Sequence, residues 1–218
     1  MYIYCLPKLL SWDETDSKLL KFVSAQRLER IQSYYLESDR KLSLYAFLLV
    51  RQCLSTISGL SAFDLDFGLD KNHKPTCLSK TSLHFNLSHT QGFILCGIST
   101  LDPVGLDVER ITSAPFSIMR KFFHPMEIQY VKDAPSSEQD NRFYEIWTKK
   151  EAYTKQQGTG LVPNLSKLNI LSSDIYPLLH TWKYNNYICS ICNSSISPNK
   201  ITYIQESEIR EYFLHMSL

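Results

Sequence analysis

Two carboxylates lie two residues apart in the stretch Val104-Gly105-Leu106-Asp107-Val108-Glu109, whose alternating apolar residues predict a β-strand. Because side chains alternate between the faces of a strand, Asp107 and Glu109 share one face while the apolar residues point into a core. A divalent cation with oxygen ligands can bridge two such carboxylates. Gly105 has no side chain, which leaves room for another group to approach the backbone. An amphipathic strand with a solvated acidic face explains the same pattern, and both interpretations stay open on this stretch alone.

A second group of polar residues falls in the helical pattern from Phe143 to Lys155. Trp147, Glu151 and Lys155 are spaced four residues apart, so they share one face of the predicted helix. We expect Trp147 to anchor that face in a core, with Glu151 and Lys155 projecting from its rim and Lys150 beside them. An ordinary surface pair of Glu151 with Lys155 would give the same spacing.

The elements that position these residues follow from hydrophobic periodicity. Helical patterns cover residues 13–21, 25–35, 41–57, 116–123, 125–131 and about 140–157, with Gly59 and Gly158 as stop signals. Strand patterns cover residues 2–4, 83–88, 93–98, 104–109, 167–171, 180–184, 187–192 and 201–204. We expect strands 83–88, 93–98 and 104–109 to form one antiparallel meander that carries both His89 and the two carboxylates.

A long helix followed by strands occurs twice along the chain, which predicts a pseudo-duplicated α+β fold. We expect an N-terminal lobe at residues 1–102 and a C-terminal lobe at residues 103–218, with the acidic site on the seam between them.

The composition bounds the class of protein. The chain has 218 residues, of which 44% are hydrophobic and 12% aromatic, and a formal net charge of +1. These values support a folded core and give no sign of nucleic-acid binding through bulk charge. No apolar run reaches the length of a membrane span, and the first residues do not resemble a signal peptide. Six scattered cysteines favour reduced thiols and a cytoplasmic protein, and Cys189-Ser-Ile-Cys192 fits a packed strand better than a metal pair.

Taken together, the polar stretches resemble the signature of the 4′-phosphopantetheinyl transferases. The family pattern is G-[IVL]-D-[IVL]-E, followed further along by W-[ST]-x-K-E-[AS]-x-x-K. Here these read Gly105-Leu-Asp-Val-Glu109 and Trp147-Thr-Lys-Lys-Glu-Ala-Tyr-Thr-Lys155, and Asn86-Leu-Ser-His-Thr90 is similar to the upstream N-[IVL]-S-H-[ST] element. The length is similar to that of the monomeric, two-lobed, surfactin-type class. The resemblance implies transfer of phosphopantetheine from coenzyme A to a serine of an apo acyl, peptidyl or aryl carrier protein, with release of adenosine 3′,5′-bisphosphate.

The resemblance also implies a role for each matching residue. The Mg²⁺ ligands, or Mn²⁺ ligands, would be Asp107, Glu109 and Glu151. The residues that bind coenzyme A would be Arg27 and Arg30 at the 3′-phosphate, Lys74 and Pro75 near the nucleotide, Ser88 and His89 at a phosphate, and Lys150 and Lys155 at the pyrophosphate. The catalytic residues would be Lys155 and a proton acceptor, which is Glu127 or Glu151 acting through a water. His73 stands where the family has a glycine, and a family arginine falls on Leu42, with Arg40 or Lys41 as substitutes.

Other interpretations stay open beside this one. Arg27 and Arg30 also fit a solvated basic helix face, and Glu127 fits simple compensation of a helix dipole. Residues Lys121, Phe122, Phe123 and Met126 fit a core better than an apolar platform for a carrier protein. A Mg²⁺-dependent phosphodiesterase that acts on coenzyme A or nucleotides, and a catalytically silent module that binds carrier proteins, are the competing functions.

Overall fold

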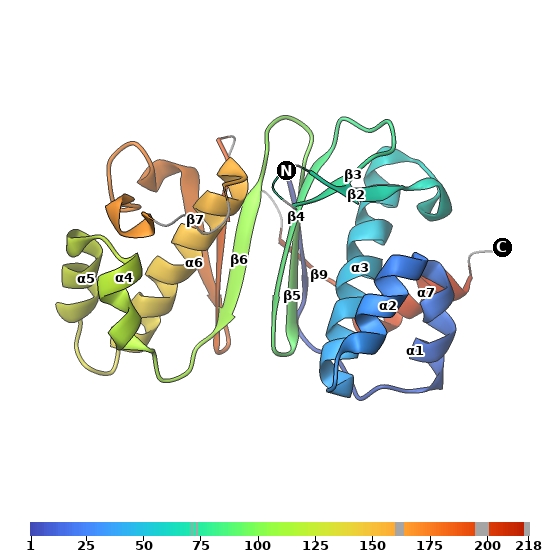
Figure 1. Ribbon diagram of the computed structural model, residues 1–218, viewed down its shortest axis with the longest axis horizontal. Coiled ribbons are helices and arrows are strands. Elements are labelled where there is room, and N and C mark those ends of the chain that lie inside the picture. The colour runs from blue at the N-terminus through green and yellow to red at the C-terminus, as the bar shows by residue number, and fades with distance from the viewer. Residues whose placement is uncertain (71, 73, 160–163, 195–200, 216–218) are drawn as a thin grey trace.

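The computed structural model describes residues 1–218 except 71, 73, 160–163, 195–200 and 216–218, and it divides into two lobes side by side (Figure 1). The helices are α1 (Glu14–Leu19), α2 (Ala25–Ser33), α3 (Glu37–Ser58), α4 (Met119–Phe122), α5 (Pro125–Lys132), α6 (Gln139–Gln157) and α7 (Glu206–Leu214). The strands are β1 (Tyr2–Leu6), β2 (Phe67–Leu69), β3 (Pro75–Cys77), β4 (His84–Thr90), β5 (Phe93–Ser99), β6 (Gly105–Arg110), β7 (Leu179–Tyr184), β8 (Tyr187–Cys192) and β9 (Ile201–Tyr203). Within this part of the chain, no helix has the length and apolarity that a membrane span requires.

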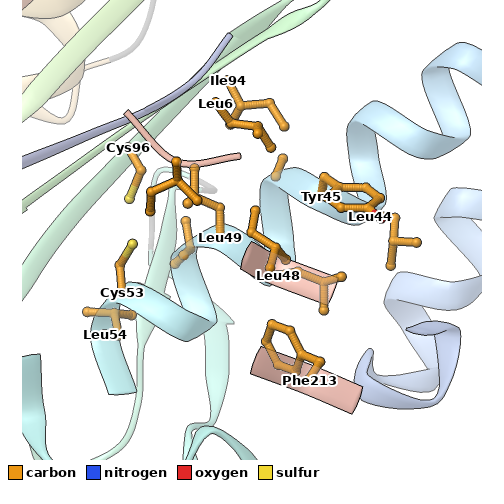
Figure 2. Packing of buried hydrophobic residues seen from close by; sticks show 14 of the residues in the cluster. Leu6, Leu44, Tyr45, Leu48, Leu49, Cys53, Leu54, Ile94, Cys96 and Phe213 are labelled. Carbon is orange, nitrogen blue, oxygen red and sulfur yellow. The ribbon is translucent and has the colours of Figure 1, made fainter. Parts of the chain in front are cut away.

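Each lobe consists of a long helix packed on a sheet, which confirms the predicted two-lobed α+β architecture. The first sheet has the strand order β4-β5-β1-β9 and the second has the order β6-β8-β7. In the first lobe, the apolar face of α3 packs on β4 and β5, and Figure 2 shows Leu48 and Leu49 of α3 facing Ile94 of β5. The predicted stop signals are also confirmed, since α3 and α6 end at Gly59 and Gly158, whose φ angles are 74° and 68°.

The expected meander is wrong, because β6 leaves the first sheet. Its main-chain partner is β8, where Asp107 pairs with Ser190. Towards the first lobe, β6 faces β4 through a side chain instead, since the backbone N–H of Leu106 donates to Asn86 Oδ1 at 2.9 Å. His89 and the carboxylates therefore come together across a seam between two sheets and not within one sheet.

The C-terminal end of the chain returns to the first lobe. Strand β9 pairs in parallel with β1, and α7 packs against α3. The helix α7 was missed by the sequence analysis, and residues 201–214 do not lie with the lobe to which residues 103–218 were assigned. Their position is fixed by a buried ion network, in which Lys41 Nζ lies 2.9 Å from Asp16 and 2.8 Å from Glu206.

One short strand assignment is also corrected. Residues 167–171 begin with the last residue of a 3₁₀ turn at Leu165–Lys167 and do not form a strand. The backbone N–H of Ile170 donates to the Glu127 carboxylate at 2.8 Å, so a side chain takes the place of a neighbouring strand.

Helix α6 and strand β6 approach each other very closely at Gly105. A Cβ atom added there would lie 2.0 Å from the carbonyl oxygen of Ala152 and 2.2 Å from the backbone nitrogen of Gln156. The group that approaches the backbone of Gly105 is therefore helix α6 itself. Because no side chain separates the two backbones, α6 carries Glu151 and Lys155 directly over β6.

We expect Gly105→Ala to displace α6 and to lower the midpoint of thermal unfolding by roughly 6–12 °C, since overpacking against rigid backbone costs about 3 kcal/mol. The matched control is Gly97→Ala in β5, where the added Cβ would meet side chains and no backbone, the nearest atom being the flexible end of Leu106 at 2.7 Å. Differential scanning calorimetry of the two variants measures the difference. Equal midpoints for both would contradict the close-packing argument.

Candidate active site

Three elements meet at the carboxylate of Asp107 on the seam. Its Oδ1 atom accepts a hydrogen bond from Lys155 Nζ at 2.6 Å and another from Ser88 Oγ at 2.8 Å. Lys155 also donates to Ser88 Oγ at 3.2 Å. Since these residues come from β6, α6 and β4, the seam joins a strand of each lobe and the long helix of the second lobe at one carboxylate.

The acidic side chains on the seam are close enough to influence one another. The pKa of Glu109 is raised to about 7, mainly by burial and further by the charges of Asp107 and Glu151, although Lys155 and a hydrogen bond from Trp147 act in the opposite direction. Burial also raises the pKa of Glu151, again with a contribution from Asp107. The predicted metal ligands Asp107, Glu109 and Glu151 are therefore close enough for their charges to interact.

The donor set fits a hard divalent cation. All three side chains offer carboxylate oxygens, which Mg²⁺ prefers, and Asp107 Oδ2 is buried without a hydrogen-bond partner. A cation there would satisfy this oxygen and offset the repulsion that raises the pKa of Glu109 and Glu151. Among the described residues, no three or more acidic, histidine or cysteine side chains are close enough together to hold a metal ion as they stand. The positive charge next to Asp107 comes from Lys155.

A pocket of about 270 Å³ lies beside the carboxylates in the first lobe, between α2 and β4. Six of the residues predicted to bind coenzyme A line it, namely Arg27, Arg30, Pro75, Ser88, His89 and Lys155. Ser88 and Lys155 belong to both places, because they line the pocket and also bind Asp107. The predicted phosphate contacts and the predicted metal ligands thus share one continuous site.

The pocket concentrates positive charge. Burial lowers the pKa of Arg27 and the neighbouring Arg30 lowers it further, while Arg27 Nε is buried without a hydrogen-bond partner. Burial also lowers the pKa of His89, and Arg27, Lys155 and Arg30 add to that shift. Groups that repel one another in this way are stabilised when an anion binds among them. The arrangement favours an anion-binding pocket over a solvated basic helix face.

Lys74 lies behind this pocket. Its ammonium group donates to the carbonyl oxygen of Lys155 at 2.8 Å and to that of Val104 at 3.4 Å, which ties the first lobe to the end of α6. It lines a neighbouring pocket of about 320 Å³ together with Pro75. His73 falls outside the described residues.

The expected placement of Lys150 is wrong. Successive helical residues point in directions about 100° apart, so Lys150 faces away from Glu151 and Lys155. Its side chain is fully buried, and its Nζ lies 2.6 Å from Glu127 Oε2. Glu127 is fully buried too, so neither residue reaches the pocket or the seam.

Neither candidate for the missing family arginine lines the pocket. Lys41 belongs to the buried ion network of the first lobe, and Arg40 Nε donates to the carbonyl oxygen of Tyr34 at 2.8 Å. The lining residue nearest in the chain is Ser43, whose carbonyl oxygen accepts from Arg27 at 3.4 Å.

Two residues of the quoted motifs have positioning roles that the sequence did not indicate, although Trp147 was expected as a core anchor. Asn86 holds β4 to β6 through Leu106, and Trp147 donates to Glu109. The core predicted beside Glu127 is confirmed for Phe122 and Phe123, which pack on Trp147. The prediction is wrong for Lys121, which is exposed, and for Met126, which is 60% exposed.

Comparisons with known proteins agree with this geometry. A family profile described as the 4′-phosphopantetheinyl transferase superfamily matches residues 103–208, and one described as the 4′-phosphopantetheinyl transferase N-terminal region matches residues 11–99. The chain is 31% identical to the 4′-phosphopantetheinyl transferase ffp of Bacillus subtilis over 170 residues, which cover 78% of this chain and 75% of that protein. It is 27% identical to the 4′-phosphopantetheinyl transferase gsp of Aneurinibacillus migulanus over 220 residues, which cover 93% and 92%.

In the free protein, burial and the neighbouring cations hold the pKa of His89 below its usual value. Sulfate is a dianion at every pH at which an imidazole titrates, so we expect it to bind the pocket and to raise the pKa of His89. Binding then takes up a proton, so the affinity for sulfate increases as the pH falls through the raised pKa. Titration of the imidazole NMR signals with and without sulfate measures the shift. His89→Gln assigns the signal and should remove this part of the pH dependence. A pKa of His89 that sulfate leaves unchanged would contradict the assignment.

Proposed function

Because the chain belongs to the surfactin-type 4′-phosphopantetheinyl transferases, we propose that it moves 4′-phosphopantetheine from coenzyme A to a serine hydroxyl of an apo carrier protein and releases adenosine 3′,5′-bisphosphate. The observation that carries this proposal is the cationic pocket, which continues into the three seam carboxylates through Ser88 and Lys155. A polyanionic donor and a divalent cation are the pair of ligands that such a site suits.

The positive side chains of the pocket would bind the phosphates of coenzyme A. Arg27 and Arg30 lie together at the side of the pocket formed by α2, and we assign them to the 3′-phosphate. Ser88 and His89, at the end of β4, can donate to a phosphate oxygen. Lys155 stands between the pocket and Asp107, so its ammonium group suits the pyrophosphate, where negative charge develops during transfer.

The carboxylates of Asp107, Glu109 and Glu151 would hold Mg²⁺, with Mn²⁺ as a substitute. The cation, when bound, supplies positive charge to the pyrophosphate as the transfer proceeds. In the transfer, the serine oxygen forms a new bond to the phosphorus on the pantetheine side. The bond from this phosphorus to the bridging oxygen breaks, and its electron pair leaves with adenosine 3′,5′-bisphosphate.

The serine hydroxyl must lose a proton during this step, and a positioned carboxylate is the usual acceptor. Of the two acceptors predicted from the sequence, Glu151 lies on the seam beside Asp107, and Glu127 is buried away from it. We therefore assign the role to Glu151, which acts through a water molecule. Lys155 then remains the catalytic cation at the leaving group.

The partners follow from the proposed reaction. The acceptor would be an acyl, peptidyl or aryl carrier protein of fatty-acid, polyketide or nonribosomal peptide synthesis, and the enzyme would act as a monomer, since each lobe contributes one side of the site. All six cysteines are free, which supports the cytoplasm as the compartment.

We expect the protein to load an apo carrier protein with one phosphopantetheine in the presence of coenzyme A and Mg²⁺, and EDTA to abolish the loading. Asp107→Asn keeps the size of the side chain but removes its charge, so loading should fall at least 10²-fold while circular dichroism stays unchanged. Mass spectrometry of the carrier protein measures the product. Full loading by the Asn variant would exclude the proposed metal ligands.

The same reaction mixtures separate the competing functions. A phosphodiesterase would release adenosine 3′,5′-bisphosphate from coenzyme A without any carrier protein. A silent module would bind the carrier protein but show no Mg²⁺-dependent gain in affinity for coenzyme A by isothermal titration calorimetry. Either result would contradict the proposed transferase function and favour the competing function that predicts it.

A further inference from the structure

A buried ion pair connects α5 with α6, one residue away from Glu151. The side chains of Glu127 and Lys150 are both fully buried, and Lys150 Nζ lies 2.9 Å from Glu127 Oε1 and 2.6 Å from Oε2. The same ammonium group donates to the carbonyl oxygen of Leu168 at 2.5 Å. In Figure 1, α4 and α5 lie at the outer end of the second lobe, and α6 lies between them and β6.

The carboxylate of Glu127 is saturated with hydrogen bonds. Besides Lys150, its Oε1 atom accepts from the backbone N–H of Ile170 at 2.8 Å, and its Oε2 atom accepts from that of His124 at 2.7 Å. The bond from His124 is one half of the capping box that begins α5. A general base must come within hydrogen-bond reach of the proton that it removes, and a buried carboxylate that already accepts four hydrogen bonds offers no such approach.

The pair instead fixes the orientation of α6. Lys150 is held from α5 and from the segment before Ile170, so the helix cannot rotate about its axis without breaking these bonds. Glu151 follows Lys150 directly and points about 100° away, towards the seam. On that side α6 rests on Gly105, and Lys155 reaches Asp107. A rotation that broke the ion pair would carry Glu151 and Lys155 away from Asp107.

We propose that Glu127 and Lys150 are positioning residues, which set the rotation of α6 and thereby the place of Glu151, and that Glu127 is not the proton acceptor. This inference rests on the proposed transferase function, whose site it explains. The ion pair also explains why Lys150, the lysine of the W-[ST]-x-K-E pattern, lies away from the pocket that we assign to the phosphates.

Three variants test the proposal, namely Glu127→Gln, Lys150→Met and the double variant. Each single change leaves one buried group without its charged partner, so the unfolding midpoint should fall by roughly 6–20 °C. The double variant removes both charges, and Gln still accepts the capping bond from His124, so its midpoint should exceed that of either single variant. Its kcat should stay within about tenfold of the original, with the acidic limb of the pH profile of kcat in place.

A catalytic base at position 127 gives the opposite pattern. Glu127→Gln and the double variant would then lose at least 10²-fold in kcat, the acidic limb would disappear, and Lys150→Met would keep its activity because the base is retained. That result overturns the proposal. Comparing the two single variants at 10 °C decides the matter even when the double variant fails to fold, since a positioning role predicts equal losses for both.

The control is the pair Glu145 and Lys149 on the same helix, whose charged atoms lie 2.5 Å apart. This pair lies within α6, so Lys149→Met should lower the unfolding midpoint without changing kcat. Isothermal titration calorimetry of coenzyme A with Mg²⁺ is the independent readout, and both single variants at positions 127 and 150 should lose Mg²⁺-dependent affinity. If the original protein loads no carrier protein, the proposed function fails, and that outcome is visible before any variant is compared.

Discussion

The site depends on the direct packing of the α6 backbone on strand β6 at Gly105. Side chains usually separate a helix from a sheet, and that separation would place a short carboxylate such as Asp107 out of reach of residues on the helix. At Gly105 the separation is absent, because even one Cβ atom would overlap the backbone of α6. Lys155 can therefore bind Asp107 at 2.6 Å, and the seam becomes a place where two lobes and one helix share a single carboxylate.

The charges around this contact are arranged as two groups of like sign with Lys155 between them. In the pocket, burial lowers the pKa of His89 and the charges of Arg27, Lys155 and Arg30 lower it further, and on the seam burial and then the charge of Asp107 raise the pKa of Glu109. Each group is held in place although its members repel one another, which is the condition of a preorganised ionic site. A polyanion and a divalent cation would each relieve one repulsion, and their mutual attraction would couple the two binding events.

Local chemistry made much of this predictable from the sequence. Alternation identified β6, the four-residue spacing placed Glu151 and Lys155 on one face, and glycines marked both helix ends. Strand pairing was not predictable, because alternation shows that a segment is a strand but not which strand lies beside it. Asn86 shows the difficulty, since a side-chain amide takes the place of main-chain pairing at the seam. The position of α7 depends on Asp16 and Lys41, which lie far from it in the sequence.

Lys150 was misplaced because a lysine is usually exposed, and only a distant partner makes its burial tolerable. An apolar pair at positions 127 and 150 could fill the same space, but it would leave the backbone groups of His124, Leu168 and Ile170 without partners. One buried ion pair satisfies all three, so its value lies in a unique arrangement of segments more than in stability. Helix α6 is thus fixed by opposite means on two sides, by a missing side chain at Gly105 and by a buried charge at Lys150, and Glu151 lies between them.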